Sequence, residues 1–511
     1  MYLDAKAQEN IPLSTKNDDF FPYGDCEHCY WTGYFTSRPT AKRFERLSSS
    51  FLQTARQLIV ADNRLPKEEK RKAVSSLTAA IGLNNHHDGI SGTAKQHVAF
   101  DYMKILDAAL TTAEQVSARI LGGPNSDKTP LVTCRLANES VCSATQSLIA
   151  GQKGYVVVYN SLARARSQQV EVYLSEEAVE TGATIYRIRD GRQQSIYAEI
   201  VPSTYPAVSA DSAPYTLYFT AENVGALRAS TFVVEIDGSA SQAKLLKQQL
   251  WNPGNAFSVS NGLLRVQFDG VSGRMSGLTR LDQIDLSASV SNDMMYYTSF
   301  GSPGHTGFKY AVPDSRPPLT KHLNPAEYSV GESSSQASGA YIFRPIEENE
   351  SPTPIRDTSS VNLEQVFYYI GEEVCVVTQV FSSWATTTHR LRRGTIGLEM
   401  DWTVGPVPIS DHIGKEIIMK WDTGLETDST FYSDSNGREF MKRVKDYRPT
   451  WDFYVSEHVA ANYYPASAAA YMKDVNTGAQ ISVITDRSQG MSSLHDGSME
   501  FMVHRRMLRD G

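Results

Sequence analysis

Two adjacent histidines and the acidic residue after them, His86, His87 and Asp88, are the side chains in this sequence best suited to chemistry. A neutral imidazole is a good zinc ligand. The neighbouring carboxylate can orient a second group or accept hydrogen bonds from the hydroxyl groups of a ligand. Gly89, which follows, permits a sharp turn of the backbone. These residues fall between two predicted helices, where one imidazole can point into a cleft while the other packs behind it.

The same segment also has a purely structural interpretation. Asp88 or Ser91 can cap the helix that follows, by accepting hydrogen bonds from its first backbone N–H groups. A catalytic zinc has about three or four protein ligands, and the other histidines form no HxxxH or HxH pattern. The residues alone therefore leave both interpretations open, and they define no self-contained metal site.

One pair of cysteines gives information about the cellular compartment of the protein. Cys134 and Cys142 flank a polar loop, a spacing that suits a small loop closed by a disulfide. Between them, Asn138-Glu139-Ser140 is an acceptor for N-glycosylation, and a second acceptor begins at Asn349. A cysteine-flanked loop that holds such an acceptor favours an oxidising compartment of the secretory route.

The other three cysteines carry less information. Cys26 and Cys29 form a CxxC motif, which we interpret as a local disulfide or as free thiols. No second CxxC is present to complete a zinc ribbon, and no βαβ pattern frames a redox pair. Cys375 lies in an apolar run and is predicted to be a core residue.

Length and composition are those of a multidomain globular protein. The 511 residues suffice for about three or four domains. With a formal net charge of −8 and no basic stripe, nothing in the sequence indicates nucleic-acid binding. No run of about 18 apolar residues predicts a membrane span. Residues 1–6 lack the apolar core of a signal peptide, which by itself favours a cytosolic protein.

Three helices are predicted around the His-His-Asp segment. The first begins near Thr40 and the second at Pro66, a favourable residue for a first helical turn. The third begins after Thr93, and all three show apolar residues spaced three and four apart. Because the links between them are short, we expect a small bundle over residues 40–121.

After this bundle the pattern changes to strands separated by turn residues. Residues 150–240 predict one small antiparallel β domain, and residues from about 255 onward predict a large sandwich. The strands expected are 155–159, 170–174, 196–201, 217–220, 231–236, 263–268, 397–403, 417–421, 469–472, 480–485 and 501–508. The fold class is therefore α+β multidomain, a three-helix bundle followed by antiparallel β-sandwich domains.

Several long motifs resemble glycoside hydrolase family 38, the α-mannosidases, and most closely its lysosomal type. These motifs are Asp18-Asp19-Phe20-Phe21-Pro22-Tyr23, Trp31-Thr32-Gly33-Tyr34-Phe35-Thr36-Ser37-Arg38-Pro39, residues 86–98, Ser338-Gly339-Ala340-Tyr341-Ile342-Phe343, Thr485-Asp486-Arg487-Ser488-Gln489-Gly490 and His504-Arg505-Arg506. The resemblance runs from about residue 15 to the end. In that family a catalytic β/α barrel precedes a three-helix bundle and then β domains.

The resemblance implies a domain division. Residues 1–30 would be the C-terminal remnant of the barrel, so that only the tail of a β/α barrel stands at the N-terminus. Residues 31–121 would be the three-helix middle domain, 122–245 a small β-sandwich and 246–511 a large β-sandwich that is truncated at its C-terminus. The Cys134 and Cys142 pair matches a disulfide of the family, whereas the segment from Cys26 to Cys29 does not match the family pattern.

The resemblance also implies roles for five residues. His87 matches a zinc ligand and Asp88 a residue that contacts the sugar. Trp31 matches an aromatic side chain near the sugar pocket, and Tyr341 a tyrosine that reaches sugar hydroxyls from the β region. Arg487 matches an arginine that lines the pocket. The structural alternatives are ordinary aromatic packing for Trp31 and Tyr341 and a surface ion pair for Arg487.

The catalytic carboxylates are expected elsewhere. A retaining glycosidase needs a nucleophile and an acid/base carboxyl group about 5–5.5 Å apart. In the family both aspartates, and the remaining zinc ligands, precede the first matched residue. Asp18 and Asp19 match a segment beyond those aspartates, so we assign no catalytic residue in this chain.

Two functions follow as hypotheses. In the first, the chain is part of a zinc-dependent retaining α-mannosidase that hydrolyses terminal α-linked mannose from N-glycan oligosaccharides, in a lysosome or another acidic secretory-route compartment or after secretion. Its partners would be the mannose-containing oligosaccharide and an upstream catalytic polypeptide or further copies of itself, with no nucleic acid and no membrane. In the second, it is a non-catalytic module that binds carbohydrate or a partner. An in-frame HxD motif and catalytic aspartate encoded before Met1 would favour the first hypothesis.

Overall fold

The computed structural model describes most of the chain. It covers residues 1–508 with the exceptions of 10, 12–14, 17, 27, 126–129, 190–191, 204–209, 239–242, 284–285, 303–336, 347–350, 357–364, 451–454 and 456. The acceptor asparagine Asn349 lies outside the described residues. Among the helices of the described part, none combines the length and the apolar composition that crossing a membrane requires.

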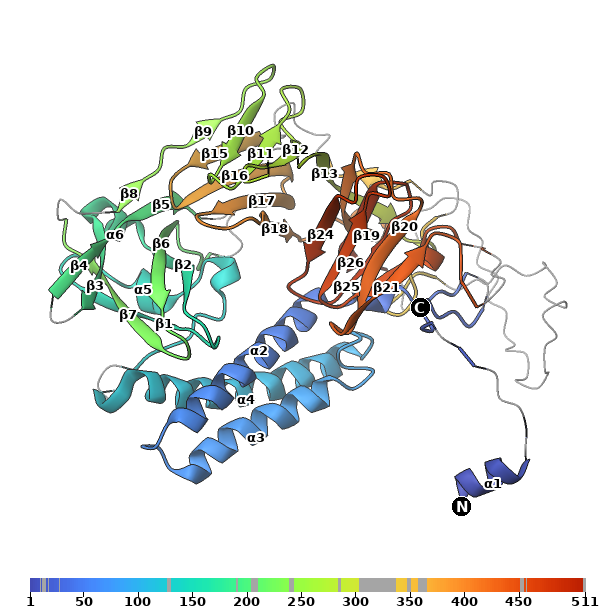
Figure 1. Ribbon diagram of the computed structural model, residues 1–511, viewed down its shortest axis with the longest axis horizontal. Coiled ribbons are helices and arrows are strands. Elements are labelled where there is room, and N and C mark those ends of the chain that lie inside the picture. Colours follow the sequence, from blue (N-terminus) through green and yellow to red (C-terminus); the bar gives the residue numbers. More distant parts are fainter. Residues whose placement is uncertain are drawn as a thin grey trace.

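Three long helices form the bundle that the sequence predicts (Figure 1). They are α2 (Pro39–Ala61), α3 (Lys67–Asn84) and α4 (Gln96–Gly122). Pro66 is the residue that directly precedes α3. The predicted apolar stripes meet in one core, which consists of Leu52, Ala55, Leu77, Ala80, Ile81, Leu106, Ala109, Leu110 and Ala113. The helical prediction is therefore confirmed, and the core lies along the shared axis of the three helices.

The shorter helical elements were not predicted. They are α1 (Tyr2–Glu9), η1 (Gly33–Phe35), η2 (Gly123–Asn125), η3 (Ala137–Glu139), α5 (Ser143–Gln146), α6 (Glu176–Thr181) and η6 (Ala460–Asn462). Helix α1 stands apart from the rest of the molecule (Figure 1), and none of its residues is buried. It lacks the apolar periodicity by which a sequence reveals a packed helix.

The small β domain consists of two facing sheets. Its strands are β1 (Lys153–Tyr159), β2 (Arg166–Leu174), β3 (Ala183–Arg189), β4 (Arg192–Ile196), β5 (Ala198–Pro202), β6 (Tyr215–Val224), β7 (Ala229–Ile236) and β8 (Lys244–Leu245). One sheet has the order β1-β7-β3-β4 and the other β2-β6-β5-β8. All strand pairs within the described part of residues 150–240 are antiparallel, as the sequence predicts, and β8, which follows that range, pairs with β5 in parallel.

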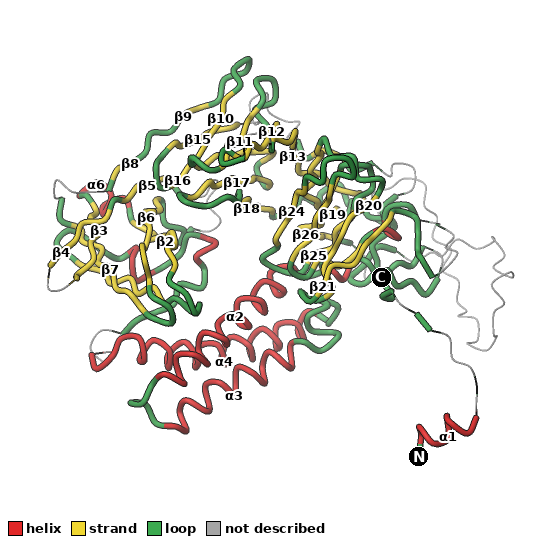
Figure 2. The backbone as a smooth tube through the Cα atoms, viewed as in Figure 1, coloured by secondary structure: helices red, strands yellow, loops and turns green. Residues whose placement is uncertain are grey.

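The described residues after β8 form three further sheets, and their strands are yellow in Figure 2. Their strands are β9 (Gln249–Leu250), β10 (Phe257–Ser260), β11 (Leu264–Phe268), β12 (Met275–Arg280), β13 (Ser287–Thr298), β14 (Thr353–Pro354), β15 (Gln365–Ile370), β16 (Val374–Ser382), β17 (Ala385–Arg392), β18 (Glu399–Val404), β19 (Lys415–Thr423), β20 (Thr430–Ser435), β21 (Glu439–Val444), β22 (Tyr464–Ala466), β23 (Ala469–Lys473), β24 (Gln480–Ile484), β25 (Gln489–Ser492) and β26 (Ser498–Arg506). The largest sheet joins β13 to β19 and β19 to β26. Each predicted strand overlaps an observed one, although the prediction for 196–201 spans two strands, β4 and β5.

The cysteines behave as the sequence suggests. Cys134 is joined to Cys142, and Cys26 to Cys29, so the disulfide alternative holds for the CxxC motif. Cys375 is buried in β16.

The candidate site lies where three parts of the chain meet. The α3–α4 turn brings His86–Asp88, the segment before α2 brings Trp31, and the loop between β13 and β14 brings Tyr341.

Candidate functional site

The α3–α4 turn is built on a tight backbone. The Gly89 N–H donates to the His86 carbonyl (2.8 Å), and the Gly92 N–H donates to the Gly89 carbonyl (3.0 Å). A Cβ on Gly89 would lie 2.5 Å from the Asn84 carbonyl oxygen. Gly92 has a φ of +78°, and a Cβ there would lie 2.3 Å from the Ser37 carbonyl oxygen. Only glycine fits these two positions, so the turn presents the histidines on a backbone with little freedom.

Two basic residues at the start of α2 hold this turn. Arg38 Nε donates to the Gly92 carbonyl (3.2 Å), and Lys42 Nζ donates to the Ile90 carbonyl (2.5 Å). Lys42 is only 4% exposed. Desolvation by burial, with repulsion from Arg505, lowers the pKa of the Lys42 ammonium group to about 7. The turn is thus fixed by hydrogen bonds from residues that lie far from it in the sequence.

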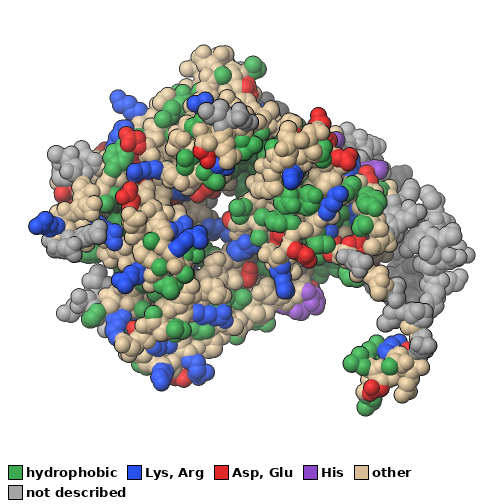
Figure 3. Space-filling view, viewed as in Figure 1, with side chains coloured by type: hydrophobic (Ala, Val, Ile, Leu, Met, Phe, Trp, Pro, Cys, Tyr) green, Lys and Arg blue, Asp and Glu red, His purple; other side chains and the backbone are tan. Residues whose placement is uncertain are grey.

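The three predicted polar side chains converge on one another. His86 Nε2 lies 3.2 Å from Asp88 Oδ2, and His87 Nε2 lies 3.6 Å from the same oxygen. One potential metal-ligand atom from each of these three residues lies within 4.8 Å of the other two. The side chains of His87 and Asp88 are 84% and 41% exposed. Histidine colour gathers at this end of the bundle, beside the C-terminal sheets (Figure 3). The cluster therefore presents nitrogen and carboxylate ligands at an open surface.

Asp88 does not cap the following helix. The residue at the N-cap of α4 is Lys95, whose side chain makes no capping hydrogen bond. Asp88 Oδ1 instead accepts from the Tyr341 hydroxyl (3.4 Å) and from Thr93 Oγ1 (3.5 Å). Ser91 Oγ donates to the His87 carbonyl rather than to the start of α4. The capping interpretation is wrong for both residues, and the Asp88 carboxylate is held toward the β region.

Aromatic side chains continue the wall from Tyr341. The Trp31 ring lies 4.9 Å from that of Tyr341, centroid to centroid, at an angle of 55°. Tyr23 contacts Trp31 edge to face, with centroids 5.1 Å apart. The Trp31 indole N–H donates to Asp25 Oδ1 (3.2 Å). The structure therefore brings together four of the five residues that the sequence singles out, and it adds Tyr23 and Asp25 beside them.

Arg487 lies elsewhere. It forms an ion pair with Asp486, donates to the Pro39 carbonyl (3.3 Å) and stacks over the Trp402 ring, with its guanidinium carbon 4.8 Å from the centroid. It lines a cavity of about 1120 Å³ whose lining includes none of the other four predicted residues. The structural alternative of an ion pair thus describes its surroundings, and this placement does not connect Arg487 with the His87 cluster.

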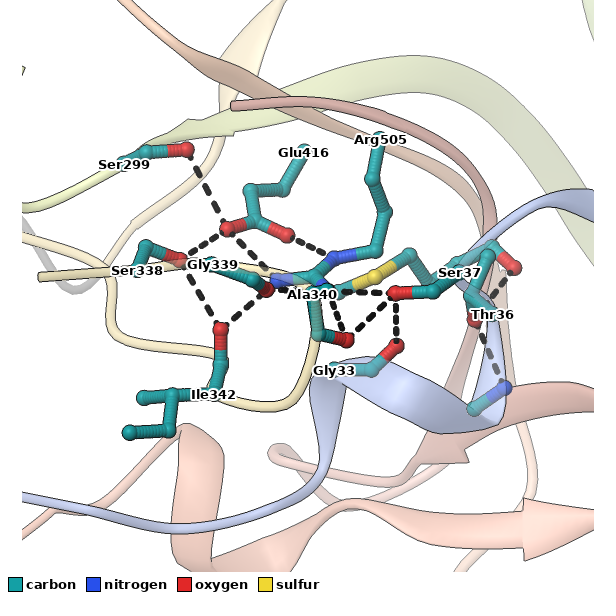
Figure 4. Close-up of polar contacts among 12 residues, drawn as sticks. Gly33, Thr36, Ser37, Ser299, Ser338, Gly339, Ala340, Ile342, Glu416 and Arg505 are labelled. Carbon is teal, nitrogen blue, oxygen red and sulfur yellow. Dashed lines mark hydrogen bonds and ion pairs between the residues drawn. The ribbon is translucent and has the colours of Figure 1, made fainter. Parts of the chain in front are cut away.

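A buried ion pair positions the loop that carries Tyr341 (Figure 4). The side chains of Arg505 and Glu416 are 1% and 0% exposed and contact each other directly. Arg505 also donates to the Gly339 carbonyl (2.8 Å) and to the Ile342 carbonyl (2.8 Å). These two carbonyls flank Tyr341 along the chain, so the guanidinium group fixes the backbone on both sides of the tyrosine.

The same arginine reaches the segment that follows Trp31. Arg505 Nη1 donates to Ser37 Oγ (2.9 Å), and a Cβ on Gly33 would lie 2.3 Å from that nitrogen. The Gly33 N–H in turn donates to the Tyr341 carbonyl (3.0 Å). One guanidinium group therefore ties the tyrosine loop to the segment that carries the tryptophan.

Sequence reasoning assigned Arg505 and Glu416 no role. Arg505 stands in the His504-Arg505-Arg506 segment, but its ion pair depends on Glu416, which lies 89 residues away. The available signal is a charged side chain inside an apolar strand, Glu416 beside Ile417 and Ile418, since such a charge needs a buried partner. That signal identifies the need for a partner but not which arginine supplies it.

The chain belongs to glycoside hydrolase family 38. Residues 259–511 match the glycosyl hydrolases family 38 C-terminal domain, and residues 29–122 match the α-mannosidase middle domain.

Within that family, the chain is similar to lysosomal α-mannosidases. It is 36% identical to the lysosomal alpha-mannosidase of Homo sapiens over 518 residues, which cover 100% of this chain and 46% of that protein. It is 31% identical to that of Dictyostelium discoideum over 541 residues, 100% of this chain and 48% of that protein. The chain thus spans about half the length of the curated relatives it matches.

A solved structure shares the fold. An α-mannosidase from Enterococcus faecalis V583 superposes with a TM-score of 0.54 at 13% sequence identity, over 99% of this chain and 55% of that chain.

Proposed function

We propose that this chain forms one wall of the active site of a zinc-dependent retaining α-mannosidase, which hydrolyses terminal α-linked mannose from N-glycan oligosaccharides. The observation that carries the proposal is the meeting of His87, Asp88, Tyr341 and Trp31 from three separate segments. Two of these side chains offer ligand atoms for a metal or hydrogen bonds for hydroxyl groups, and two offer aromatic surface. That combination suits a sugar bound beside a metal ion.

The donor set fits zinc. His87 would hold the ion through Nε2, with the Asp88 carboxylate beside it, since imidazole nitrogen and carboxylate oxygen are common zinc ligands. When bound, zinc supplies a Lewis acid that holds and polarises sugar hydroxyl groups. The hydrogen bonds of the turn, including that from Lys42 to the Ile90 carbonyl, keep the His87 backbone in place for this role.

The remaining residues bind the sugar. Asp88, fixed by the Tyr341 hydroxyl, accepts hydrogen bonds from sugar hydroxyls. The Tyr341 hydroxyl oxygen accepts a hydrogen bond from a hydroxyl group of the same sugar. Trp31 covers an apolar face of the sugar with its indole. Arg487 stays a candidate for lining the pocket; among the described residues it contacts Asp486, Pro39 and Trp402.

The bond-breaking carboxylates are proposed to come from another part of the polypeptide. The His87 side chain is 84% exposed, and a catalytic zinc has about three protein ligands besides an open position. A further segment, from an upstream catalytic polypeptide or another copy of the chain, would cover His87 and complete the ligand set. The nucleophile and acid/base would come with that segment.

The domain boundaries and the compartment belong to the same proposal. We assign residues 1–30 to the end of the catalytic barrel, 31–121 to the middle domain, 122–245 to the small sandwich and 246–511 to the large one. The relatives named as lysosomal and the two disulfides support a lysosomal or other secretory-route location.

Zinc content tests the ligand assignment. In the whole α-mannosidase, where the further segment completes the ligand set, we expect His87→Ala to lower the zinc affinity roughly tenfold or more. His97→Ala is the matched control, because His97 is also exposed and lies ten residues further along the chain. Equal zinc content in the His87 variant and the wild type would reject His87 as a ligand.

An activity assay tests the proposal that the catalytic carboxylates lie outside this chain. With zinc present, the chain by itself is expected to give no turnover of 4-nitrophenyl α-mannoside, since it carries neither proposed carboxylate. Robust zinc-dependent hydrolysis by these 511 residues would overturn that division.

A further inference from the structure

The segment from Tyr23 to Trp31 forms a loop beside the proposed sugar site. The Trp31 N–H donates to the Tyr23 carbonyl (2.8 Å), and Gly24 and Tyr30 form an antiparallel bridge. The disulfide between Cys26 and Cys29 closes the loop near its tip. Both arms of the loop are therefore tied together at their base and again close to the turn.

Asp25 reaches across this loop to the indole. It directly precedes Cys26 on the outgoing arm, and its Oδ1 accepts from Trp31 Nε1 at the end of the returning arm (3.2 Å). Since the disulfide limits how far the two arms can separate, it also limits how far Asp25 can move from Trp31. Tyr23 and Tyr341 contact the same indole, at 5.1 and 4.9 Å between ring centroids.

The returning arm is fixed to the β region. His28 Nδ1 lies 2.6 Å from Glu457 Oε1, and Glu457 is only 3% exposed. The Phe343 N–H donates to the Tyr30 carbonyl (3.3 Å). The returning arm thus cannot shift without breaking contacts with buried residues, whereas the outgoing arm, which carries Asp25, is exposed. The disulfide is the covalent link between the exposed arm and the anchored one.

We propose that Asp25 and the Cys26–Cys29 disulfide are positioning groups that hold the Trp31 indole against Tyr341 as one wall of the sugar site. The role of that wall in sugar binding rests on the proposed function, whereas the positioning itself does not. The acceptor oxygen of Asp25 sets the rotation of the indole, and the disulfide keeps that oxygen within reach. The CxxC motif therefore serves ligand binding through Trp31 and not through its sulfur atoms.

The test follows the indole directly. The full chain is labelled with 5-fluorotryptophan, so that its six tryptophans give separate ¹⁹F resonances, and Trp31→Phe assigns the Trp31 signal. Asp25→Ala and the double variant Cys26→Ser/Cys29→Ser are expected to shift and broaden that signal. Asp25→Asn retains an amide oxygen as acceptor and is expected to leave it near its wild-type position.

Two internal controls separate positioning from general disturbance. Trp251, whose indole donates to the Asn255 carbonyl (2.9 Å), should keep its resonance in every variant. The double variant Cys134→Ser/Cys142→Ser removes the other disulfide and should leave the Trp31 signal unchanged. An unchanged Trp31 signal in Asp25→Ala or in Cys26→Ser/Cys29→Ser would overturn the proposal, as would an equal shift in Asp25→Asn and Asp25→Ala.

Titration with methyl α-mannoside in the presence of zinc then tests the consequence for binding. Asp25→Ala should weaken the affinity roughly two- to tenfold, the value of one hydrogen bond, and Asp25→Asn should restore it. If the sugar leaves the wild-type Trp31 signal unmoved, the sugar contact of the proposed function fails, while the ligand-free spectra still decide the positioning. If the sugar binds and Asp25→Ala binds it equally well, the positioning proposal fails and the proposed function stands.

Discussion

The buried pair of Arg505 and Glu416 gives the sharpest prediction about stability. Replacing Arg505 by Met keeps much of the side-chain volume but leaves Glu416, which is 0% exposed, without its cation. Removing one partner of a buried pair costs about 3–5 kcal/mol. Glu416 retains hydroxyl donors from Ser299 and Ser338, which soften the loss. We therefore expect Arg505→Met to lower the free energy of unfolding by about 4 kcal/mol.

A double variant separates charge from hydrogen bonding. In Arg505→Met/Glu416→Leu no charge is left unpaired, so the electrostatic part of the loss should be recovered. The Gly339 and Ile342 carbonyls still lack the donor that Arg505 supplied. Each unsatisfied buried acceptor costs about 1–3 kcal/mol, reduced where water can enter. The double variant should therefore lie about 2 kcal/mol below the wild type and above the single variant.

Urea unfolding measures these differences. For a domain with an m value of about 3 kcal/mol/M, a loss of 4 kcal/mol moves the midpoint by about 1.3 M. The midpoint is followed by circular dichroism of the strands, and m should stay constant if only stability changes. A loss below about 1 kcal/mol in Arg505→Met would show that Glu416 does not depend on Arg505 for its burial, because a buried carboxylate that loses its cation carries a larger free-energy penalty. A double variant less stable than the single one would refute the assignment of the loss to charge.

Three further predictions concern the glycine turn, the pH dependence of stability and the tyrosine. Gly92→Ala should cost about 3 kcal/mol in thermal or urea unfolding, because its Cβ meets a carbonyl at 2.3 Å; Gly151→Ala, with a similar φ of +79° but open space, should cost only about 1–2 kcal/mol. Burial raises the pKa of Glu500 to about 7 from its ordinary value of 4.5. Between pH 4.5 and 7 the Glu500 carboxyl group is protonated in the folded state and ionised in the unfolded state. The stability that Glu500 contributes is therefore complete below pH 4.5 and is lost as the pH rises through about 7. Urea midpoints of Glu500→Gln should lack this fall, which reaches about 2 kcal/mol between pH 5 and 7; equal slopes in the two proteins would contradict it. Tyr341→Phe should weaken methyl α-mannoside binding roughly two- to tenfold by removing the hydroxyl that meets Asp88, with zinc content unchanged.

The parts of the fold that the sequence predicts are those with a local pattern. The bundle could be predicted because Leu77 and Leu106 belong to stripes that repeat every three or four residues, and both are fully buried. Strand β17 was missed for the opposite reason. Its sequence, Ala385–Arg392, is rich in threonine and ends in polar residues, yet almost all of it is buried between neighbouring strands. Its burial is set by the pairing with β16 and β18, which no local window contains.

The candidate site divides in the same way. Adjacent residues such as His87 and Asp88 were found because their chemistry is visible in a single turn, and their mutual distance follows from their neighbourhood in the chain. Tyr341 lies 253 residues from Asp88, and only the family resemblance placed them in one site. For Arg487 the role implied by the resemblance stays a prediction, and its observed ion-pair partner, Asp486, is its immediate neighbour in the chain.

The way in which the wall is held explains which substitutions should matter. The residues proposed to touch the sugar are partly exposed, and few contacts fix each of them: Asp88 has two hydroxyl donors, and Trp31 has one acceptor and two ring contacts. The rigidity behind them comes from Arg505, whose guanidinium group contacts both the tyrosine loop and Ser37. A change at the surface should therefore alter binding with little effect on folding, whereas a change at Arg505 should alter both. The order of stability losses among these variants measures how much of the site is set by the buried pair and how much by the surface loops.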